Sequence, residues 1–224
     1  AFDDACRIVD RRRPLRVVLD HLEEVLPIIY TPQSVGLSVL ASVEDFKPTV
    51  LIGACGQAAI FTRSVLGAMS RLNDRPIVFA LSNPTSKAEC TAEQAYAWTD
   101  GRAIFASGSP FDAVTLAGRT QTPGQGNNAF VFPGVGLGLL LSGARRVTDE
   151  MFLAAAGALA DQVSALDLQQ GRVFPSAARM REVALAVSVA VELSPRDAVF
   201  VDGSHAVQRN VRHDAVLVVE GKRA

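Results

Sequence analysis

The sequence predicts an α/β protein built on a doubly wound parallel sheet with flanking helices. Three compact apolar runs, at 49–52, 76–81 and 103–106, have the length and composition of strands. They are continuous rather than alternating, which is typical of strands that are buried on both faces. Helix-like stretches separate the three runs. Strand and helix therefore alternate in the order that gives parallel βαβ units.

The chain before the first strand is predicted to be mostly helical. Apolar residues recur at helical spacing over 15–26, and Pro27 ends this pattern. A short apolar run, Ile28-Ile29-Tyr30, follows. The phenol of Tyr30 fits either a proton donor or a buried structural tyrosine, and chemistry alone favours the structural role. A second short helix is predicted over 38–46, because Lys47-Pro48 then breaks the helical pattern.

Two helices connect the three strands. The first is predicted over 62–72. Thr91-Ala92-Glu93-Gln94 has the capping-box pattern that opens the second. Two further strands are predicted in the tail, over 198–201 and 215–219.

Three more helices are predicted after the third strand. They cover 127–141, a segment that begins after Thr148, and 176–192. The apolar face of the helix after Thr148 is expected to contain Phe152, Ala155, Leu159, Val163 and Leu166.

Composition excludes several classes of protein. The chain has 224 residues, of which 49% are hydrophobic and 20% charged, so wholesale disorder is excluded. The formal net charge of −1 provides no basic field, and we therefore expect no nucleic-acid partner and no membrane partner. The longest apolar stretch, 130–144, is short and interrupted by proline and glycine, so no membrane-spanning helix is predicted there. The opening residues lack a signal-peptide pattern.

The cysteine pattern favours a reducing compartment. Cys6, Cys55 and Cys90 are odd in number and form no CxxC pair. Neither a disulfide framework nor a zinc site is indicated. A cytoplasmic location is the corresponding expectation.

Small and polar residues follow each of the three central strands. These segments are Gly53-Ala54-Cys55-Gly56, Ser82-Asn83-Pro84 and Ser107-Gly108-Ser109-Pro110. In open α/β sheets, ligands bind beyond the carboxyl ends of the strands. Tight turns between strand and helix explain the same composition, and both interpretations stay open.

Two further segments have a possible binding role. Pro123-Gly124-Gln125-Gly126-Asn127-Asn128 precedes an apolar helix, and it fits either an anion site or an asparagine N-cap after a flexible loop. Gly134-Val135-Gly136-Leu137-Gly138 lies inside an apolar helix-like stretch rather than after a strand, so close helix packing is favoured over dinucleotide binding. The chain contains no GxGxxG, P-loop, HExxH or GxSxG motif.

Other polar residues are interpreted as structural. His21, His205 and His213 share no spacing that suggests a common site. Glu23-Glu24 and Glu44-Asp45 are interpreted as solvated helix faces, because a divalent cation usually needs oxygen ligands from more than one segment.

Three long segments together resemble malic enzyme. They are KPTVLIGACGQ (47–57), FALSNPTSKAECTAEQAYAWTDGRAIFASGSPF (79–111) and TPGQGNNAFVFPGVGLG (122–138). HLEEVLPIIYTP (21–32) is similar to a motif of the family's N-terminal domain. The resemblance implies a partial doubly wound, Rossmann-like domain over 47–192, with a short helical N-terminal segment over 1–46 and an unassigned tail over 193–224.

The resemblance also implies an activity. Malic enzymes convert malate to pyruvate and CO₂ with reduction of NAD⁺ or NADP⁺, and they use Mg²⁺ or Mn²⁺. Carried over by position, Tyr30 is the proton donor, Gly53, Ala54 and Asn83 contact the cofactor, and Asn83 also lies near the substrate. Asn127 and Asn128 match the tandem asparagines that hold the substrate carboxylate. The partners are then malate or pyruvate and a nicotinamide dinucleotide, and we expect a homo-oligomer.

The chain departs from the family pattern in its centre. Only sixteen residues separate Tyr30 from Lys47, so the segments for the catalytic lysine, the acidic metal ligands and GxGxxG are missing. Val43-Glu44-Asp45-Phe46 is similar to the family's acidic metal-binding motif, but its position directly before KPTVLIG favours a chance match. Lys47 and Lys87 are candidate substitute bases, although side chains that face solvent are the favoured interpretation of both. Ala59 stands where the family pattern predicts glycine. Two hypotheses follow: an oxidative malate decarboxylase, or a catalytically inactive module that binds a ligand or subunit.

Overall fold

The computed structural model describes residues 27–30, 38–194 and 216–220, the first and last of these as backbone only. The chain divides into two compact units. The first comprises Ala1–Gly126 and Asn210–Ala224, and the second comprises Asn127–Arg209.

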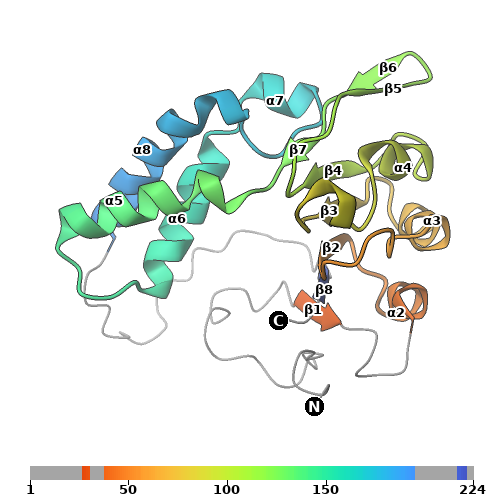
Figure 1. Ribbon diagram of the computed structural model, residues 1–224, viewed down its shortest axis with the longest axis horizontal. Helices are drawn as coiled ribbons and strands as arrows, with labels where there is room; N and C mark the ends of the chain where they lie inside the picture. Colours follow the sequence, from red (N-terminus) through yellow and green to blue (C-terminus); the bar gives the residue numbers. More distant parts are fainter. Residues whose placement is uncertain (1–26, 31–37, 195–215, 221–224) are drawn as a thin grey trace. The chain divides into compact units, whose positions relative to one another are not determined.

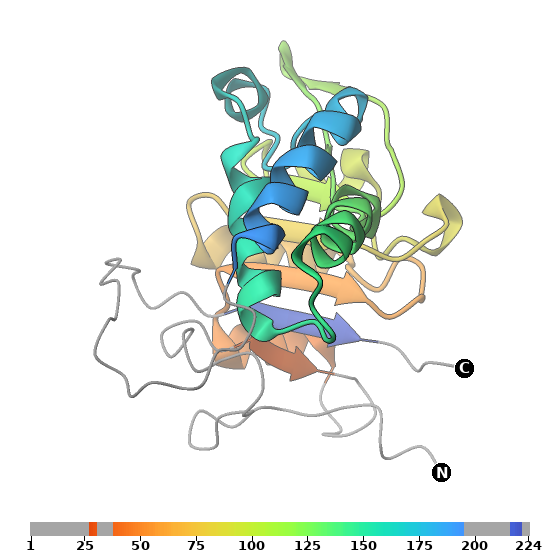
Figure 2. The same cartoon turned by 90° about the vertical axis from the view of Figure 1, so that its left-hand side faces the viewer.

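The first unit contains a six-stranded parallel sheet with the strand order β1-β8-β2-β3-β4-β7. Figure 1 labels these strands, and Figure 2 shows their arrows pointing the same way. The predicted α/β class, the three central strands and the strand near 215–219 are confirmed. The bounds are β1 Pro27–Tyr30, β2 Val50–Ala54, β3 Ile77–Ala80, β4 Ile104–Ser107, β7 Gly124–Gln125 and β8 Val216–Glu220.

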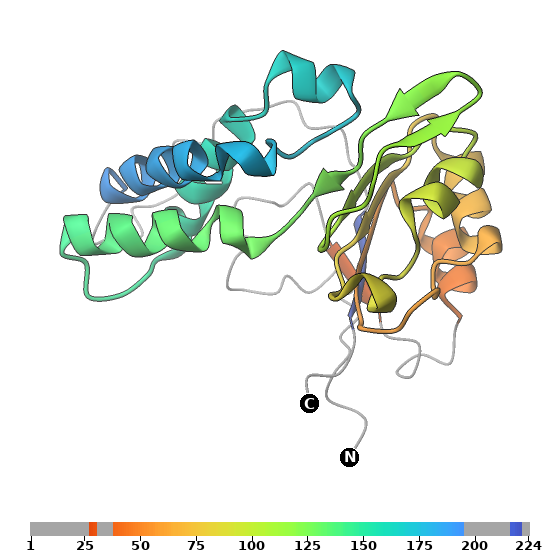
Figure 3. The same ribbon diagram turned by 45° about the horizontal axis from the view of Figure 1, so that its top comes forward.

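Three helices of this unit lie along the same face of the sheet (Figure 3). They are α2 Val39–Phe46, α3 Arg63–Leu72 and α4 Ala92–Ala97. Each begins at a hydroxyl side chain that accepts a hydrogen bond from the first turn, which satisfies one of the free N–H groups there. The capping box predicted at Thr91 and Gln94 is present.

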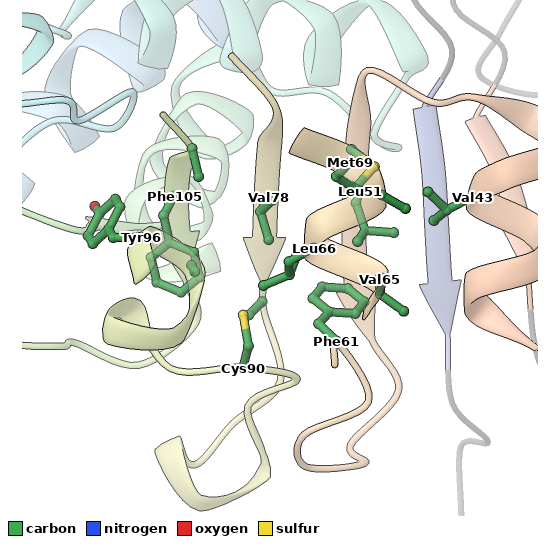
Figure 4. Packing of buried hydrophobic residues seen from close by; sticks show 14 of the residues in the cluster. Val43, Leu51, Phe61, Val65, Leu66, Met69, Val78, Cys90, Tyr96 and Phe105 are labelled. Carbon is green, nitrogen blue, oxygen red and sulfur yellow. The ribbon is translucent and has the colours of Figure 1, made fainter. Parts of the chain in front are cut away.

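A continuous apolar core joins these helices to the sheet (Figure 4). Leu51, Val78 and Phe105 supply it from β2, β3 and β4, and all three are fully buried. Burying each such side chain stabilises the fold by about 1.5–3 kcal/mol. The ring of Tyr96 from α4 meets Phe105 edge to face, with 6.0 Å between ring centroids. This core fixes the strands whose ends form the candidate site.

A small antiparallel hairpin follows β4 and was not predicted. It pairs β5 Val114–Leu116 with β6 Arg119–Gln121. Ala117 and Gly118 at its turn both have positive φ, 48° and 78°. Tight hairpin turns of this kind usually use Asn-Gly or Asp-Gly, so the Ala-Gly turn gave no sequence signal.

The second unit is helical. The segment predicted as one helix over 127–141 instead forms a 3₁₀ turn, η2 Asn128–Phe130, and then α5 Phe132–Ser142. The remaining elements are α6 Asp149–Asp161, α7 Ala165–Gln169, the 3₁₀ turn η3 Ala177–Arg179 and α8 Met180–Glu192.

Glycines let α5 pack closely against α8. A Cβ at Gly134 would lie 2.6 Å from the Ala184 carbonyl oxygen, and one at Gly138 would lie 2.7 Å from that of Ser188. The interpretation of Gly134–Gly138 as a helix-packing segment is thus confirmed.

The predicted apolar face after Thr148 is partly wrong. Phe152 is 47% exposed, while its neighbour Met151 is fully buried together with Ala155. Leu166 is 60% exposed and lies in the separate helix α7, which begins at its own N-cap, Ser164. The cap at Ser164 ends the continuous helical pattern that the apolar spacing suggested.

Several predictions lie outside the described residues. They concern the helix over 15–26, the strand over 198–201, Cys6, Glu23-Glu24 and the three histidines. Among the described helices, none is long and apolar enough to span a membrane.

Candidate functional site

The parallel strands of the first unit end at one edge of the sheet, and a single row of residues crosses that edge. Val219 of β8 pairs with Tyr30 on one side and with Gly53 on the other. Gly53 pairs with Ala80, Ala80 with Ser107, and Ser107 with Gln125. Neighbouring strands are about 4.8 Å apart, so the backbones of Tyr30 and Gly53 are roughly 10 Å apart. The strand ends singled out from the sequence therefore meet at one edge.

The ends of β3 and β4 are joined by polar contacts around Asn83. Ser109 Oγ donates to Asn83 Oδ1 at 2.5 Å, and Ser107 Oγ donates to the Ser109 carbonyl at 2.8 Å. A Cβ at Gly108 would lie 2.8 Å from Asn83 Nδ2, so only glycine permits this approach. Asn83 itself is exposed, and its amide can still reach a ligand.

The ends of β2 and β3 are joined by a carboxylate that the sequence did not reveal. Glu89 is fully buried, with 0% exposure. Its Oε1 accepts from the Cys55 backbone N–H at 3.1 Å and from Ser82 Oγ, and its Oε2 accepts from the Ser82 backbone N–H at 3.3 Å. A sequence signal is hard to find, because Glu89 lies in a stretch that resembles an ordinary polar loop.

Burial of Cys55 and the nearby Glu89 charge change the chemistry of the thiol. Burial is the main cause, and together with the Glu89 carboxylate it raises the pKa of Cys55 from 9.0 to about 11. Cys55 Sγ lies 3.4 Å from Glu89 Oε1 and can donate to it as a thiol. Cys55 is accordingly a neutral hydrogen-bond donor near pH 7 rather than a nucleophile.

The Gly124–Asn128 segment is divided between the two units. Gln125 Nε2 donates to the Gly108 carbonyl at 3.3 Å, and the Gly126 N–H donates to the Ser107 carbonyl at 2.9 Å. Asn127 begins the second unit as the N-cap of η2, because its Oδ1 accepts from the Ala129 N–H at 2.9 Å. Asn128 is exposed within η2.

The predicted site residues thus fall into two groups. Tyr30, Gly53 and Ala54 lie at the carboxyl edge of the sheet, and Asn83 lies just beyond the end of β3. The second group, Asn127 and Asn128, belongs to the helical unit.

The two candidate bases differ in their position. Lys47 caps the carboxyl end of α2 and precedes β2, so it lies toward the amino edge of the sheet, away from the strand ends. Lys87 lies in the 3₁₀ turn η1 Thr85–Lys87, four residues after Asn83, and it is exposed. Position therefore argues against Lys47 as a base.

The described acidic residues do not fit a metal centre. Glu44 and Asp45 are exposed near the end of α2, and Glu44 forms a 3.7 Å surface ion pair with Arg71. Across the described ranges, no group of three His, Cys, Asp or Glu side chains could hold a metal ion. We therefore derive no step through a metal ion.

The strand ends do fit the nicotinamide end of a dinucleotide. Gly53, Ala80 and Ser107 of this row are small but buried. Ala54, directly after Gly53, is exposed, and its small side chain lets a flat ring approach the end of β2. Asn83 adds an exposed amide beside them, which suits hydrogen bonding to a carboxamide. The chain lacks the GxGxxG loop that would hold the pyrophosphate.

Comparisons with known proteins agree with these features. Residues 23–194 match the family model described as malic enzyme, NAD binding domain. The chain is 54% identical over 153 residues to NADP-dependent malic enzyme 3 of Arabidopsis thaliana, a match that covers 68% of this chain and 26% of that protein. It is 47% identical over 188 residues to a chloroplastic NADP-dependent malic enzyme of Zea mays, covering 82% and 28%. It is 53% identical over 150 residues to NADP-dependent malic enzyme of Columba livia, covering 66% and 27%.

The chain spans about a quarter of the length of these curated relatives. The family match, in contrast, covers most of the chain itself and includes every described strand except β8. The resemblance seen in the sequence is thereby confirmed, and the chain belongs to the malic enzyme family.

Proposed function

We propose that this chain provides the nicotinamide side of the dinucleotide-binding domain of a malic enzyme, which oxidises malate to pyruvate and CO₂. The observation that supports this most strongly is the row of small and polar residues at the strand ends, within a segment that matches the NAD-binding domain of the family. A bound nicotinamide dinucleotide would accept the hydride from malate.

Each candidate residue has a proposed role. Ala54, exposed at the end of β2, lets the nicotinamide ring approach, and Gly53 supports this approach by leaving room for the Glu89 side chain. The exposed Asn83 amide orients the ring or the substrate. Asn127 and Asn128 donate hydrogen bonds to a substrate carboxylate. Tyr30 protonates the carbon from which CO₂ has departed, as a phenol can.

The identity of the cofactors is a finer proposal. The relatives named above are NADP-dependent malic enzymes, which supports NADP⁺ as the first cofactor to test and NAD⁺ as the second. The family resemblance also implies Mg²⁺ or Mn²⁺, although the described residues offer no ligand set for such an ion.

Three broader expectations stay predictions. They are the division into 1–46, 47–192 and 193–224, a homo-oligomeric state, and a cytoplasmic location. A chloroplastic relative shows that plastids also contain malic enzymes of this kind.

A turnover assay tests the proposed activity. The purified chain is incubated with malate, Mn²⁺ and NADP⁺ or NAD⁺, and absorbance of the reduced nicotinamide is followed. We expect turnover that falls by on the order of 10²-fold or more in Tyr30→Phe, because a general acid contributes about 10²–10⁴-fold.

The second tyrosine supplies a matched control. Tyr96 is buried in the core beside Phe105, so Tyr96→Phe makes the same chemical change away from the strand ends. Turnover that survives Tyr30→Phe would remove Tyr30 from the reaction. No turnover with either cofactor, in a chain shown to be folded by circular dichroism, would contradict catalysis by this chain and leave ligand or subunit binding as its role.

A further inference from the structure

The Glu89 carboxylate is an unusual group to find fully buried in a protein. In the part of the chain that the structure describes, no Lys or Arg forms an ion pair with it. A buried carboxylate costs free energy unless its oxygens receive hydrogen bonds. Its neighbours therefore have to supply those bonds.

Every polar neighbour of Glu89 can serve as a donor. The backbone N–H groups of Cys55 and Ser82 can only donate. Ser82 Oγ accepts from the Gly56 N–H at 2.8 Å, which leaves its own hydrogen for Glu89. The arrangement needs an acceptor at both side-chain oxygens, which a carboxylate provides and an amide does not.

The surrounding backbone is shaped to admit this side chain. A Cβ at Gly53 would lie 2.5 Å from Glu89 Cγ and 2.6 Å from Cδ, so the strand can run past the carboxylate only as glycine. The backbone beside Glu89 is also fixed, because its carbonyl accepts from the Phe61 N–H at 3.0 Å.

We propose that Glu89 is a positioning residue that holds the carboxyl ends of β2 and β3 in the arrangement that binds the nicotinamide end of the dinucleotide. It bonds to Cys55, directly after β2, and to Ser82, two residues after β3. Ser82 in turn precedes Asn83, the candidate ligand-binding amide. The role in ligand binding rests on the proposed function, whereas the positioning of the strand ends does not.

The substitution Glu89→Gln tests this with almost no change of shape. Whichever way the new amide is oriented, its NH₂ group faces at least one backbone N–H that it cannot bond. An unsatisfied buried donor opens the local structure, so exchange of the Cys55 and Ser82 amide hydrogens should accelerate by about tenfold or more.

Thr99→Val is the matched control. Thr99 is also fully buried, and its Oγ1 donates to the Ala95 carbonyl at 2.7 Å and accepts from the Ala103 N–H at 3.1 Å. These bonds lie before β4, at the opposite end of the sheet from Glu89. Thr99→Val should accelerate amide exchange at Ala103. The exchange rates of the Cys55 and Ser82 amides should stay as they are in the wild-type chain. Uniform acceleration in both variants would overturn the positioning role.

Ligand binding forms the second part of the test. NADPH is titrated into the wild-type chain and both variants, and binding is followed by nicotinamide fluorescence. We expect Glu89→Gln to weaken the Kd for NADPH by about tenfold and Thr99→Val to leave it unchanged. Equal Kd values in wild type and Glu89→Gln would overturn the ligand-binding role. A wild-type chain that does not bind NADPH would contradict the proposed function, and the exchange data would still decide whether Glu89 fixes the strand ends.

Discussion

Ala59 adopts a backbone conformation that alanine rarely takes. Its φ is +59°, and its N–H donates to the Ala88 carbonyl at 3.2 Å in the loop between β2 and α3. The left-handed conformation costs about 1–2 kcal/mol for a residue with a Cβ, whereas the greater freedom of unfolded glycine costs about 0.5–1 kcal/mol. The resemblance led us to expect glycine at this position, and the positive φ is the conformation that favours glycine.

We predict that Ala59→Gly raises the free energy of unfolding by about 0.5–1 kcal/mol, as measured by urea denaturation. Ala58→Gly is the control, because Ala58 is equally exposed but does not have a positive φ. Ala58→Gly should lower stability by about 0.5–1 kcal/mol. If both substitutions lowered stability, the strain at Ala59 would be disproved.

The thiol of Cys55 should react slowly because its pKa is raised to about 11, mainly by burial and further by the charge of Glu89. At about pH 8 its thiolate population is on the order of a hundredfold below that of an ordinary cysteine. Alkylation by iodoacetamide, followed at the Cys55 peptide by mass spectrometry, should be correspondingly slow and accelerate up to about pH 11.

Glu89→Gln removes the charge, so the pKa of Cys55 should fall and alkylation at pH 8 should quicken. An unchanged rate would mean that the Glu89 charge does not act on the thiol.

The same pKa has a consequence for stability. The unfolded chain releases the Cys55 proton near 9.0, before the folded chain does. The contribution of this group to stability is therefore complete below that pH and is lost as the pH rises toward 11.

At the scale of elements, the contact between α5 and α8 depends on which glycines face it. Gly138 lies against the Ser188 carbonyl, whereas Gly136 of the same helix has open space around it. We predict that Gly138→Ala lowers the free energy of unfolding by about 1–3 kcal/mol through overpacking, and that Gly136→Ala raises it by up to about 1 kcal/mol through helix propensity. Chemical denaturation of both variants measures the difference. Similar effects of the two substitutions would contradict this packing.

The short helix α7 depends on a charged cap. Asp167 accepts from the Ser164 N–H at 3.0 Å and from Ser164 Oγ at 2.6 Å, and it forms a 2.8 Å ion pair with Arg172. Burial by itself would raise the pKa of Asp167, but the Ser164 hydrogen bonds and the charges of Arg172 and Arg179 outweigh it and lower the pKa.

A lowered carboxyl pKa gives stability that is present above the unfolded value, about 3.9, and is lost as the pH falls through it. We predict that Asp167→Asn lowers stability by about 3 kcal/mol at neutral pH, and that it flattens the loss of stability below about pH 4. Thermal unfolding across this pH range measures both effects. Asp161→Asn, at an exposed aspartate of α6, should change neither, and a full acid dependence in Asp167→Asn would contradict the role of the cap.

At the scale of the whole molecule, local signals predicted the elements around the candidate site. The runs at 49–52, 76–81 and 103–106 are continuous and apolar, and turn-forming residues bound them. Strands buried in a parallel sheet need this composition, so their position could be predicted from sequence. Because all carboxyl ends of such a sheet share one edge, the grouping of Gly53 with Asn83 followed from the strands alone.

Long-range pairing could not be predicted. β8 comes from the end of the chain and inserts between β1 and β2, and nothing in its five residues specifies those partners. The two-residue strand β7 is too short for a periodic signal. Glu89 carries a charge, so its sequence suggests exposure, and only the donors from two distant segments explain its burial.

The central claim is that a nicotinamide dinucleotide binds at the carboxyl ends of β2, β3 and β4. The most direct measurement is a titration of the ¹⁵N-labelled chain with NADP⁺, followed through its backbone amide resonances. The account predicts saturable shifts at Gly53, Ala54, Asn83 and Gly108, with Asn73 and Asp74 at the opposite edge unaffected. Shifts confined to other residues, or none with NADP⁺ or NAD⁺ in a folded chain, would contradict it.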